Sequence, residues 1–172
     1  MSLERYQTDP GHTFVTFEVK HALTSTVRGR FDEVQGSIEL DAATHRGRAD
    51  VTIDTGSIST GTPKFDAHLR SDAFFDAEHH RQARFVGTGF RYEGDKLAAL
   101  DGELTLLGRT HPVTLRSTSF NCYHSAHLNQ DVCGGDFEAT ILRSQWGMTW
   151  GLEIGIPDSV KLLIEIEAIK QA

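Results

Sequence analysis

Hydrophobic and polar residues alternate one by one along most of the chain. Val15, Phe17 and Val19 fall on one face of an extended segment, and Thr16 and Glu18 fall on the other. The same period of two recurs at residues 103–106, 113–116, 137–141 and 160–168. A period of two with many β-branched and aromatic residues is typical of half-buried antiparallel strands. The pattern therefore predicts an all-β chain.

Turn residues divide the alternating segments at roughly hairpin spacing, for example at Gly36, Gly94-Asp95 and Pro157-Asp158. They predict eight strands, over residues 13–21, 27–40, 48–55, 83–92, 99–107, 112–122, 134–143 and 160–169. This count takes 27–40 as one long strand that does not break at Gly29 or Gly36. Eight antiparallel strands with short turns form an up-and-down barrel or a sandwich. A closed barrel of that size is either filled by side chains or encloses one small ligand.

Two segments depart from the alternation. Between 63 and 80 the apolar residues recur at helical spacing, which predicts a short helix near 64–71 and a second turn near 73–80. The segment 144–158 is long for a hairpin loop and contains two tryptophans and a methionine. It fits either a flexible lid over the mouth of a cavity or a plug packed permanently on the barrel end.

Length and composition predict one globular domain over residues 1–172. Of the 172 residues, 38% are hydrophobic and 24% are charged, which is ordinary for a soluble protein. The formal net charge of −7 makes nucleic acid and anionic membrane surfaces unfavourable partners. No run of about 20 apolar residues occurs, so we expect no stable insertion into a membrane.

The two cysteines, Cys122 and Cys133, lie between strand-like segments. A disulfide across a hairpin is favoured over two free thiols. Together with His124 and His127 the cysteines could also form a zinc site, but their spacing is not that of a zinc finger. A disulfide suits an oxidising compartment. We therefore expect a periplasmic or secreted protein whose signal peptide is absent from this chain, with the cytoplasm as the alternative.

Signatures of catalysis are missing from the sequence. It contains no Gly-x-Ser-x-Gly motif, no phosphate-binding glycine-rich loop and no His-Glu-x-x-His motif. We therefore predict no catalytic residue, no metal and no cofactor.

Seven short motifs follow one another along the chain. They are 9–17 with Val19-Lys20-His21, 27–31 with Gly36, Ile53-Asp54 with Ser57-Ile58, 66–71 with Phe74-Phe75-Asp76, 102–106 with Gly108, His111-Pro112-Val113-Thr114-Leu115, and 143–148. Each motif is weak alone. In this order and at this spacing they resemble the YceI-like family of lipocalin-like, polyisoprenoid-binding proteins over nearly the whole chain.

The resemblance implies an extended eight-stranded antiparallel β-barrel, lipocalin-like, with a short helical excursion. It also implies a tunnel for a polyprenyl chain, a quinone tail or a similar amphiphile, and no enzymatic activity. Alternation alone favours a filled core, whereas the resemblance favours a lipid-lined cavity. The inward residues that would line it are Val15, Phe17, Val19, Leu104, Leu106, Ile141, Leu162 and Ile164.

A polar head group or the tunnel mouth is expected at five residues, Asp66, His68, Arg70, Trp146 and Met148. Arg and His side chains donate hydrogen bonds to phosphate or carbonyl oxygens. A structural network that fixes a helix is the competing interpretation of Asp66 and His68.

Two other functions remain as alternatives to a lipid carrier. One is a small enzyme that acts on a lipidic or quinone-like substrate, with His68 as its acid–base group. The other is a stress-response barrel with a filled core. We expect either a monomer or a homodimer.

Overall fold

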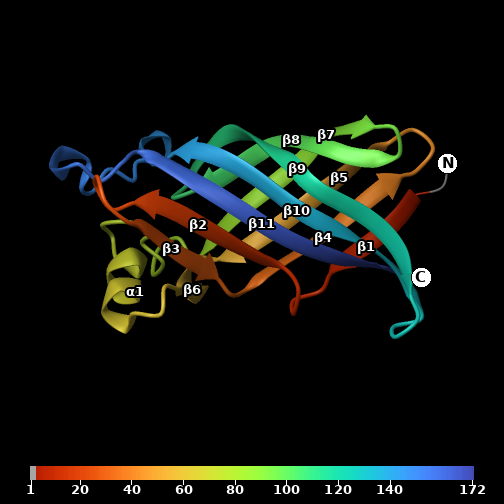
Figure 1. Ribbon diagram of the computed structural model, residues 1–172, viewed down its shortest axis with the longest axis horizontal. Coiled ribbons are helices and arrows are strands. Elements are labelled where there is room, and N and C mark those ends of the chain that lie inside the picture. Colours follow the sequence, from red (N-terminus) through yellow and green to blue (C-terminus); the bar gives the residue numbers. More distant parts are fainter. Residues whose placement is uncertain (1–2) are drawn as a thin grey trace.

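Eleven β-strands make up most of residues 3–172, the part of the chain that the computed structural model describes (Figure 1). They are β1 (Leu3–Thr8), β2 (Phe14–Lys20), β3 (Thr26–Phe31), β4 (Val34–Asp41), β5 (Arg46–Asp54), β6 (Ile58–Ser59), β7 (Gln82–Glu93), β8 (Lys96–Leu106), β9 (Arg109–Ser125), β10 (Gln130–Leu142) and β11 (Ser159–Lys170). One α-helix, α1 (Pro63–Arg70), lies between β6 and β7. Short 3-10 helices occur at Thr55–Ser57, Arg143–Trp146 and Leu152–Ile154.

Eight of the strands close an antiparallel barrel, in the order β1-β4-β5-β7-β8-β9-β10-β11, and the pairing of β1 with β11 completes the ring. The edge of β11 is shared: residues 168–170 pair with β1, and residues 161–165 pair with β2. Beyond this edge, β2, β3 and β6 extend the sheet. The predicted eight-stranded antiparallel barrel is therefore confirmed.

The predicted strand over 27–40 was wrong as a single strand. It breaks at Asp32 and Glu33, and neither Gly29 nor Gly36 interrupts it. The halves have different partners, since β3 pairs with β2 and β6 whereas β4 pairs with β1 and β5. The chain bends between the two halves, so that β3 lies in the sheet extension with β2 and β6, and β4 lies in the wall of the closed barrel.

The strand β1 was not predicted. Only Tyr6 and Thr8 are buried on it, and the other positions are charged, polar or exposed. A strand with so few apolar residues gives little alternation, although its pairing with β4 and β11 closes the barrel.

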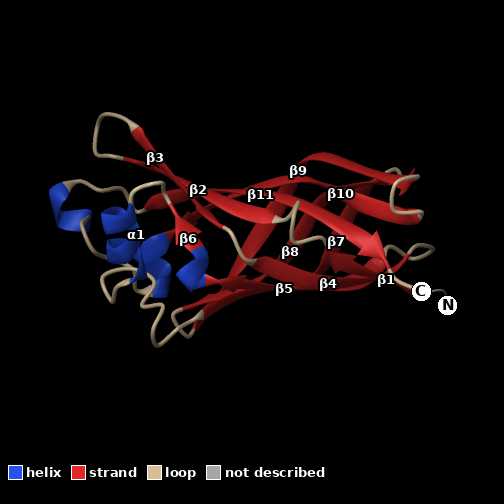
Figure 2. Ribbon diagram, turned by 90° about the horizontal axis from the view of Figure 1, so that it is seen from below, coloured by secondary structure: helices blue, strands red, loops and turns tan. Residues whose placement is uncertain are grey.

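The helix α1 confirms the helix predicted near 64–71. Pro63 occupies its first turn, where a missing N–H costs nothing. The segment after it does not continue as a helix but folds back in turns, in which Phe75 N donates to Leu69 O at 3.0 Å and Ala77 N to Arg70 O at 2.9 Å. Both ribbon views place α1 at the barrel end opposite the two termini (Figures 1 and 2). Within residues 3–172, no helix has the length and apolar character needed to cross a membrane.

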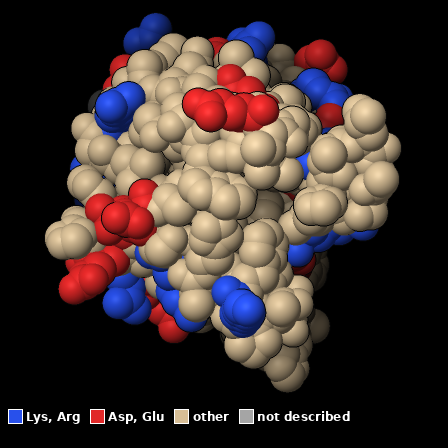
Figure 3. All heavy atoms as spheres, turned by 90° about the vertical axis from the view of Figure 1, so that its left-hand side faces the viewer, with Lys and Arg blue, Asp and Glu red and all other residues tan. Residues whose placement is uncertain are grey.

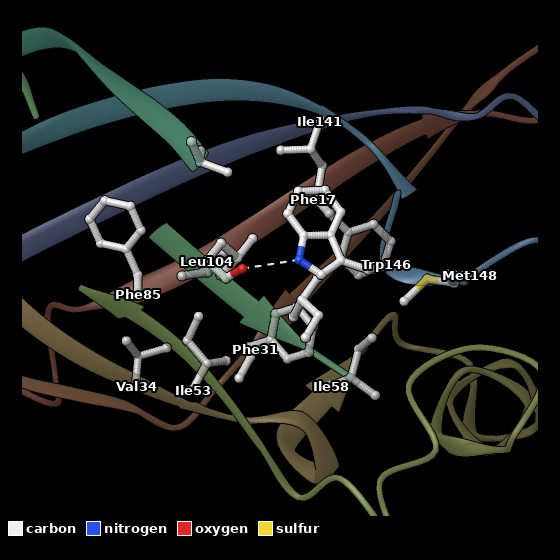
Figure 4. Packing of buried hydrophobic residues seen from close by; sticks show 14 of the residues in the cluster. Phe17, Phe31, Val34, Ile53, Ile58, Phe85, Leu104, Ile141, Trp146 and Met148 are labelled. Carbon is white, nitrogen blue, oxygen red and sulfur yellow. Dashed lines mark hydrogen bonds between the residues drawn. The ribbon is translucent and has the colours of Figure 1, made fainter. Parts of the chain in front are cut away.

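A continuous cluster of buried apolar side chains follows the inside of the barrel (Figure 4). It draws on the inward positions of β2, β5, β7 and β8, and on Trp146 and Met148 from the segment after β10. The cluster reaches α1 through Leu69, which is buried. This shared core fixes the helical end of the molecule to the barrel.

Candidate binding cavity

The barrel encloses two cavities. The one near the chain termini, here the terminus-side chamber, has a volume of about 300 Å³. The one beside α1, the helix-side chamber, has a volume of about 320 Å³. Val15, Ile53, Leu104 and Leu162 line both chambers, so the two lie back to back along the barrel. Each reaches the lower end of the range of typical ligand pockets, about 300–1,000 Å³.

All eight residues predicted as barrel lining contact a chamber, because alternate positions of a strand point to the same face. Lining the terminus-side chamber are Val15, Leu104, Leu162 and Ile164. Lining the helix-side chamber are Val15, Phe17, Val19, Leu104, Leu106, Ile141 and Leu162.

The mouth of the terminus-side chamber is polar. Tyr6 donates its hydroxyl to Glu4 at 2.8 Å, and Lys170 donates to Glu4 at 3.0 Å. The hydrogen bond from Lys170 is the main reason why the pKa of Glu4 lies below its usual value. Nearby, His45 stacks on Tyr92 with ring centroids 3.9 Å apart. Glu4, Tyr6, His45 and Tyr92 line this chamber. The sequence pattern does not predict this group, because its members come from separate strands and turns.

The cysteines also belong to the terminus-side mouth. Cys122 on β9 and Cys133 on β10 are directly opposite each other, their sulfurs are bonded, and both line the chamber. His124 makes a hydrogen bond of 2.8 Å to Asp131. The geometry thus joins the two cysteines to each other and pairs His124 with a carboxylate.

One cluster with the ligand types of a metal site occurs in residues 3–172, formed by Asp9, His12 and Glu167. His12 Nδ1 already makes a hydrogen bond of 2.9 Å to Asp9. This bond is the largest cause of the lowered pKa of Asp9 and of the raised pKa of His12. An ion pair at the surface accounts for the cluster.

The segment 144–158 combines a plug with a rim. Trp146 is only 1% exposed and donates its indole N–H to the Leu104 carbonyl at 3.0 Å, the dashed line in Figure 4. Trp146 packs in the buried apolar cluster and lies outside the linings of both chambers, whereas Met148 lines the helix-side chamber. Trp150, by contrast, is 44% exposed and lines the same chamber. The buried Trp146 packs as the predicted plug would, whereas a flexible lid at Trp150 stays a prediction.

Arg143 holds this segment in place. Its buried guanidinium donates to four backbone carbonyls, those of Pro157 at 3.0 Å, Met148 at 3.0 Å, Trp150 at 2.7 Å and Ile156 at 3.1 Å. Burial lowers the pKa of Arg143. The sequence marks Arg143 only as part of a motif, because its four acceptors are main-chain atoms with no residue signature.

A second link closes the same segment. Ser144 donates to Asp158 through its backbone N–H at 2.7 Å and through its hydroxyl at 2.5 Å. The hydroxyl bond is the largest cause of the lowered pKa of Asp158. The ends of the segment are therefore tied to each other as well as to Arg143.

Of the predicted polar group on α1, only His68 reaches a chamber. Asp66 accepts hydrogen bonds from the Thr60 N–H at 2.7 Å and the Thr60 hydroxyl at 2.6 Å, which attaches α1 to the chain after β6. Arg70 lies outside the linings of both chambers. His68 lines the helix-side chamber and meets the rings of Phe74 and Trp150 edge-on, at centroid distances of 5.1 and 4.6 Å.

Apolar side chains are exposed at the helical end of the molecule. Leu23, in the β2–β3 turn, is 100% exposed, and Ile154 is 71% exposed. Figure 3 looks onto this end, where most atoms belong to uncharged residues and the charged residues form separate small groups. Ile154 also lines the helix-side chamber, so part of this apolar surface is continuous with the cavity.

Comparisons with known proteins agree with this architecture. A family model described as YceI-like domain matches residues 6–168. A UPF0312 protein of Shewanella denitrificans is 33% identical over 169 residues, which cover 95% of this chain and 85% of the relative. In fold, the chain is similar to the crystal structure of Burkholderia cenocepacia BcnA, with a TM-score of 0.75, 22% identity, and coverage of 93% of this chain and 98% of that one. It is also similar to a polyisoprenoid binding domain from Saccharophagus degradans, with a TM-score of 0.68, 16% identity, and coverage of 96% and 98%. The chain therefore belongs to the YceI-like family.

Proposed function

We propose that this protein is a non-catalytic carrier of a long apolar lipid of the isoprenoid type, such as a polyprenyl chain or a quinone tail, held inside the barrel. The observation that carries the proposal is the pair of back-to-back chambers, which share an apolar layer of Val15, Ile53, Leu104 and Leu162. The solved neighbour described as a polyisoprenoid binding domain supports the same ligand class.

Packing argues against a filled core. Protein interiors are close-packed, with few voids larger than a water molecule. Apolar cavities of about 150 Å³ stay dry and take up apolar ligands. The chambers, at about 300 and 320 Å³, are each well above that size. A linear apolar chain fills such a space without any polar partner.

Burial supplies the binding energy in this proposal. Moving about ten CH₂ groups out of water gains roughly 8 kcal/mol at ~0.8 kcal/mol each. Ordering the chain and the side chains around it costs part of this gain.

The competing enzyme hypothesis depends on His68 as an acid–base group. A general base is normally oriented by a hydrogen bond from a third group. In residues 3–172 the ring of His68 has aromatic neighbours, Phe74 and Trp150, and no hydrogen-bonded protein partner. These aromatic surroundings of His68 favour the carrier hypothesis over the enzyme hypothesis.

Organic extraction and mass spectrometry of the purified protein test the proposal. The expected result is a long-chain lipid at near-stoichiometric yield, recovered unchanged after prolonged incubation with the protein. A protein that retains no long-chain lipid and takes up none when loaded would overturn the carrier. Conversion of the lipid to a product, lost in a folded His68→Ala variant, would establish the enzyme instead.

A further inference from the structure

The two chambers differ in the charge of the side chains that line them. Glu4 and Asp95 line the terminus-side chamber, and His45 lies there as its one basic residue among those that the structure describes. Lys20, His21 and His68 line the helix-side chamber, as does Arg143. Among the residues that the structure describes, no carboxylate lines the helix-side chamber. The terminus-side chamber therefore has carboxylates as well as a histidine in its lining, whereas the ionisable groups that line the helix-side chamber are all basic.

The basic side chains at the helix-side mouth are free to meet a ligand. Lys20 and His21 are exposed, and His68 is half-buried between two aromatic rings. Throughout residues 3–172, no hydrogen bond or ion pair from a protein group engages the side chains of these three residues. By comparison, Lys170 at the opposite mouth is bonded to Glu4.

Arg143 adds positive charge behind these groups. Its guanidinium is satisfied by backbone carbonyls, which are dipoles and carry no net charge. Asp158 acts on it through space and offsets part of the charge, but its oxygens accept from Ser144. In an apolar cavity, a positive charge acts over a longer distance than in water.

We infer that the cargo is an amphiphile with an anionic head, a carboxylate or a phosphate, that lies at the helix-side mouth against Lys20, His21 and His68. The inference rests on the proposed carrier function and adds the head-group class and the orientation. The tail extends past Leu104 into the terminus-side chamber, so that the anionic head is kept away from Glu4 and Asp95. Hydrogen bonds to ionised groups are stronger than those between neutral groups, which gives an anionic head an advantage over an alcohol.

Matched pairs of probes with one tail and two heads test the inference. The first pair is palmitate and hexadecanol, and the second is geranylgeranyl monophosphate and geranylgeraniol. Dissociation constants for the purified, delipidated protein should be at least about fivefold lower for the anion than for the alcohol. Tighter binding of the anion than of the alcohol in both pairs supports an anionic head of either kind. Tighter binding of the anion in the palmitate pair alone identifies the head as a carboxylate, and in the geranylgeranyl pair alone as a phosphate.

The readout in the variants is the ratio of the two dissociation constants within a pair. In the Lys20→Gln, His68→Gln double variant this ratio should fall toward one. The single variant Lys20→Gln, at an exposed position, should lower the ratio in part and serves if the double variant does not fold. Lys96→Gln is the matched control, because Lys96 lies near the opposite mouth and bonds Asn121.

Equal or tighter binding of the alcohols in both pairs would overturn the inference, as would an anion preference that survives in the folded double variant. Both results would still be compatible with the proposed carrier function, because a carrier of apolar chains should also bind the alcohols. If none of the four probes binds, the carrier function itself fails.

Discussion

The indole nitrogen of Trp146 lies 3.0 Å from the carbonyl oxygen of Leu104, and this hydrogen bond joins the plug of the barrel to the wall of the cavity. Leu104 is one of the residues that line both chambers. The segment after β10 is thereby fixed to the layer that the two chambers share. A gate at the helix-side mouth must therefore open in the part beyond Trp146, where Trp150 and Ile154 are exposed.

Loss of this hydrogen bond should destabilise the barrel. Trp146→Phe leaves the Leu104 carbonyl buried without its donor and opens a small void, which together should cost about 2–3 kcal/mol. For a chain of this length the melting temperature should fall by about 5–10 °C. Thermal denaturation followed by circular dichroism measures the change. Trp150→Phe is the control, because Trp150 is partly exposed, and should cost less than about 1 kcal/mol. Equal losses in the two variants would remove the special role of Trp146.

Replacement of Arg143 should release the segment that it holds. Arg143→Met leaves four carbonyls without their donor, with an expected cost of about 3 kcal/mol or more. Arg143→Lys keeps the charge but cannot reproduce the planar fork, so it should rescue little of the loss. Limited proteolysis with mass spectrometry should show faster cleavage within 147–157.

The control for Arg143 is Arg91→Met, which removes an exposed pair with Asp101 worth at most about 1 kcal/mol. Protection of 147–157 that is equal in Arg143→Met and Arg91→Met would contradict the assigned role. Full rescue by Arg143→Lys would mean that charge, and not the fork of donors, holds the segment.

Acid should weaken the link between Ser144 and Asp158. The pKa of Asp158 is lowered in the folded protein, chiefly by the Ser144 hydroxyl, so its stabilising contribution is present above the unfolded value of 3.8. That contribution is lost as the pH falls through the folded pKa. Asp158→Asn should therefore be less stable than the parent protein at pH 7, and the difference should shrink below about pH 4. Urea denaturation followed by tryptophan fluorescence measures both midpoints. A difference that stays constant from pH 7 to pH 3 would contradict this mechanism.

The disulfide should stabilise the hairpin of β9 and β10. It spans a sequence separation of 11 residues, for which loop closure predicts a contribution of about 2–3 kcal/mol. Reductant should lower the denaturation midpoint of the oxidised protein and leave that of a Cys122→Ser, Cys133→Ser double variant unchanged. A midpoint of the parent protein that is insensitive to full reduction would show that the bond adds no stability.

Much of the barrel could be predicted from the sequence because its inward faces follow a period of two. Val15, Phe17 and Val19 are examples, and each lines the helix-side chamber. The pattern failed where burial is sparse, as in β1, and where a strand changes partners without a glycine or proline, as at Asp32 and Glu33. Such positions depend on pairing between distant strands, which periodicity does not record.

The site was less predictable than the fold. Alternation identifies inward residues but not whether the space between them is filled, so the two chambers appear only in three dimensions. The helical spacing around His68 predicted α1, yet which of Asp66, His68 and Arg70 faces the cavity depends on how the helix docks. The carbonyls around Arg143 carry no side-chain signature at all. The local sequence pattern thus predicts the inward-facing residues of the barrel wall, whereas the residues at the open ends of the chambers are determined by tertiary packing.

If one long cargo lies in both chambers, a bulky side chain at the layer that they share should block it. Binding of geranylgeraniol should be measured by calorimetry for the parent protein, for Leu104→Trp and for Leu142→Trp. Leu142 is the matched control, because the same substitution there adds bulk at a position that is 46% exposed. One molecule should bind per barrel in the parent protein and in Leu142→Trp, and the affinity should be at least about tenfold weaker in Leu104→Trp. Unchanged affinity and stoichiometry in a folded Leu104→Trp variant would contradict it and place the cargo outside the tunnel.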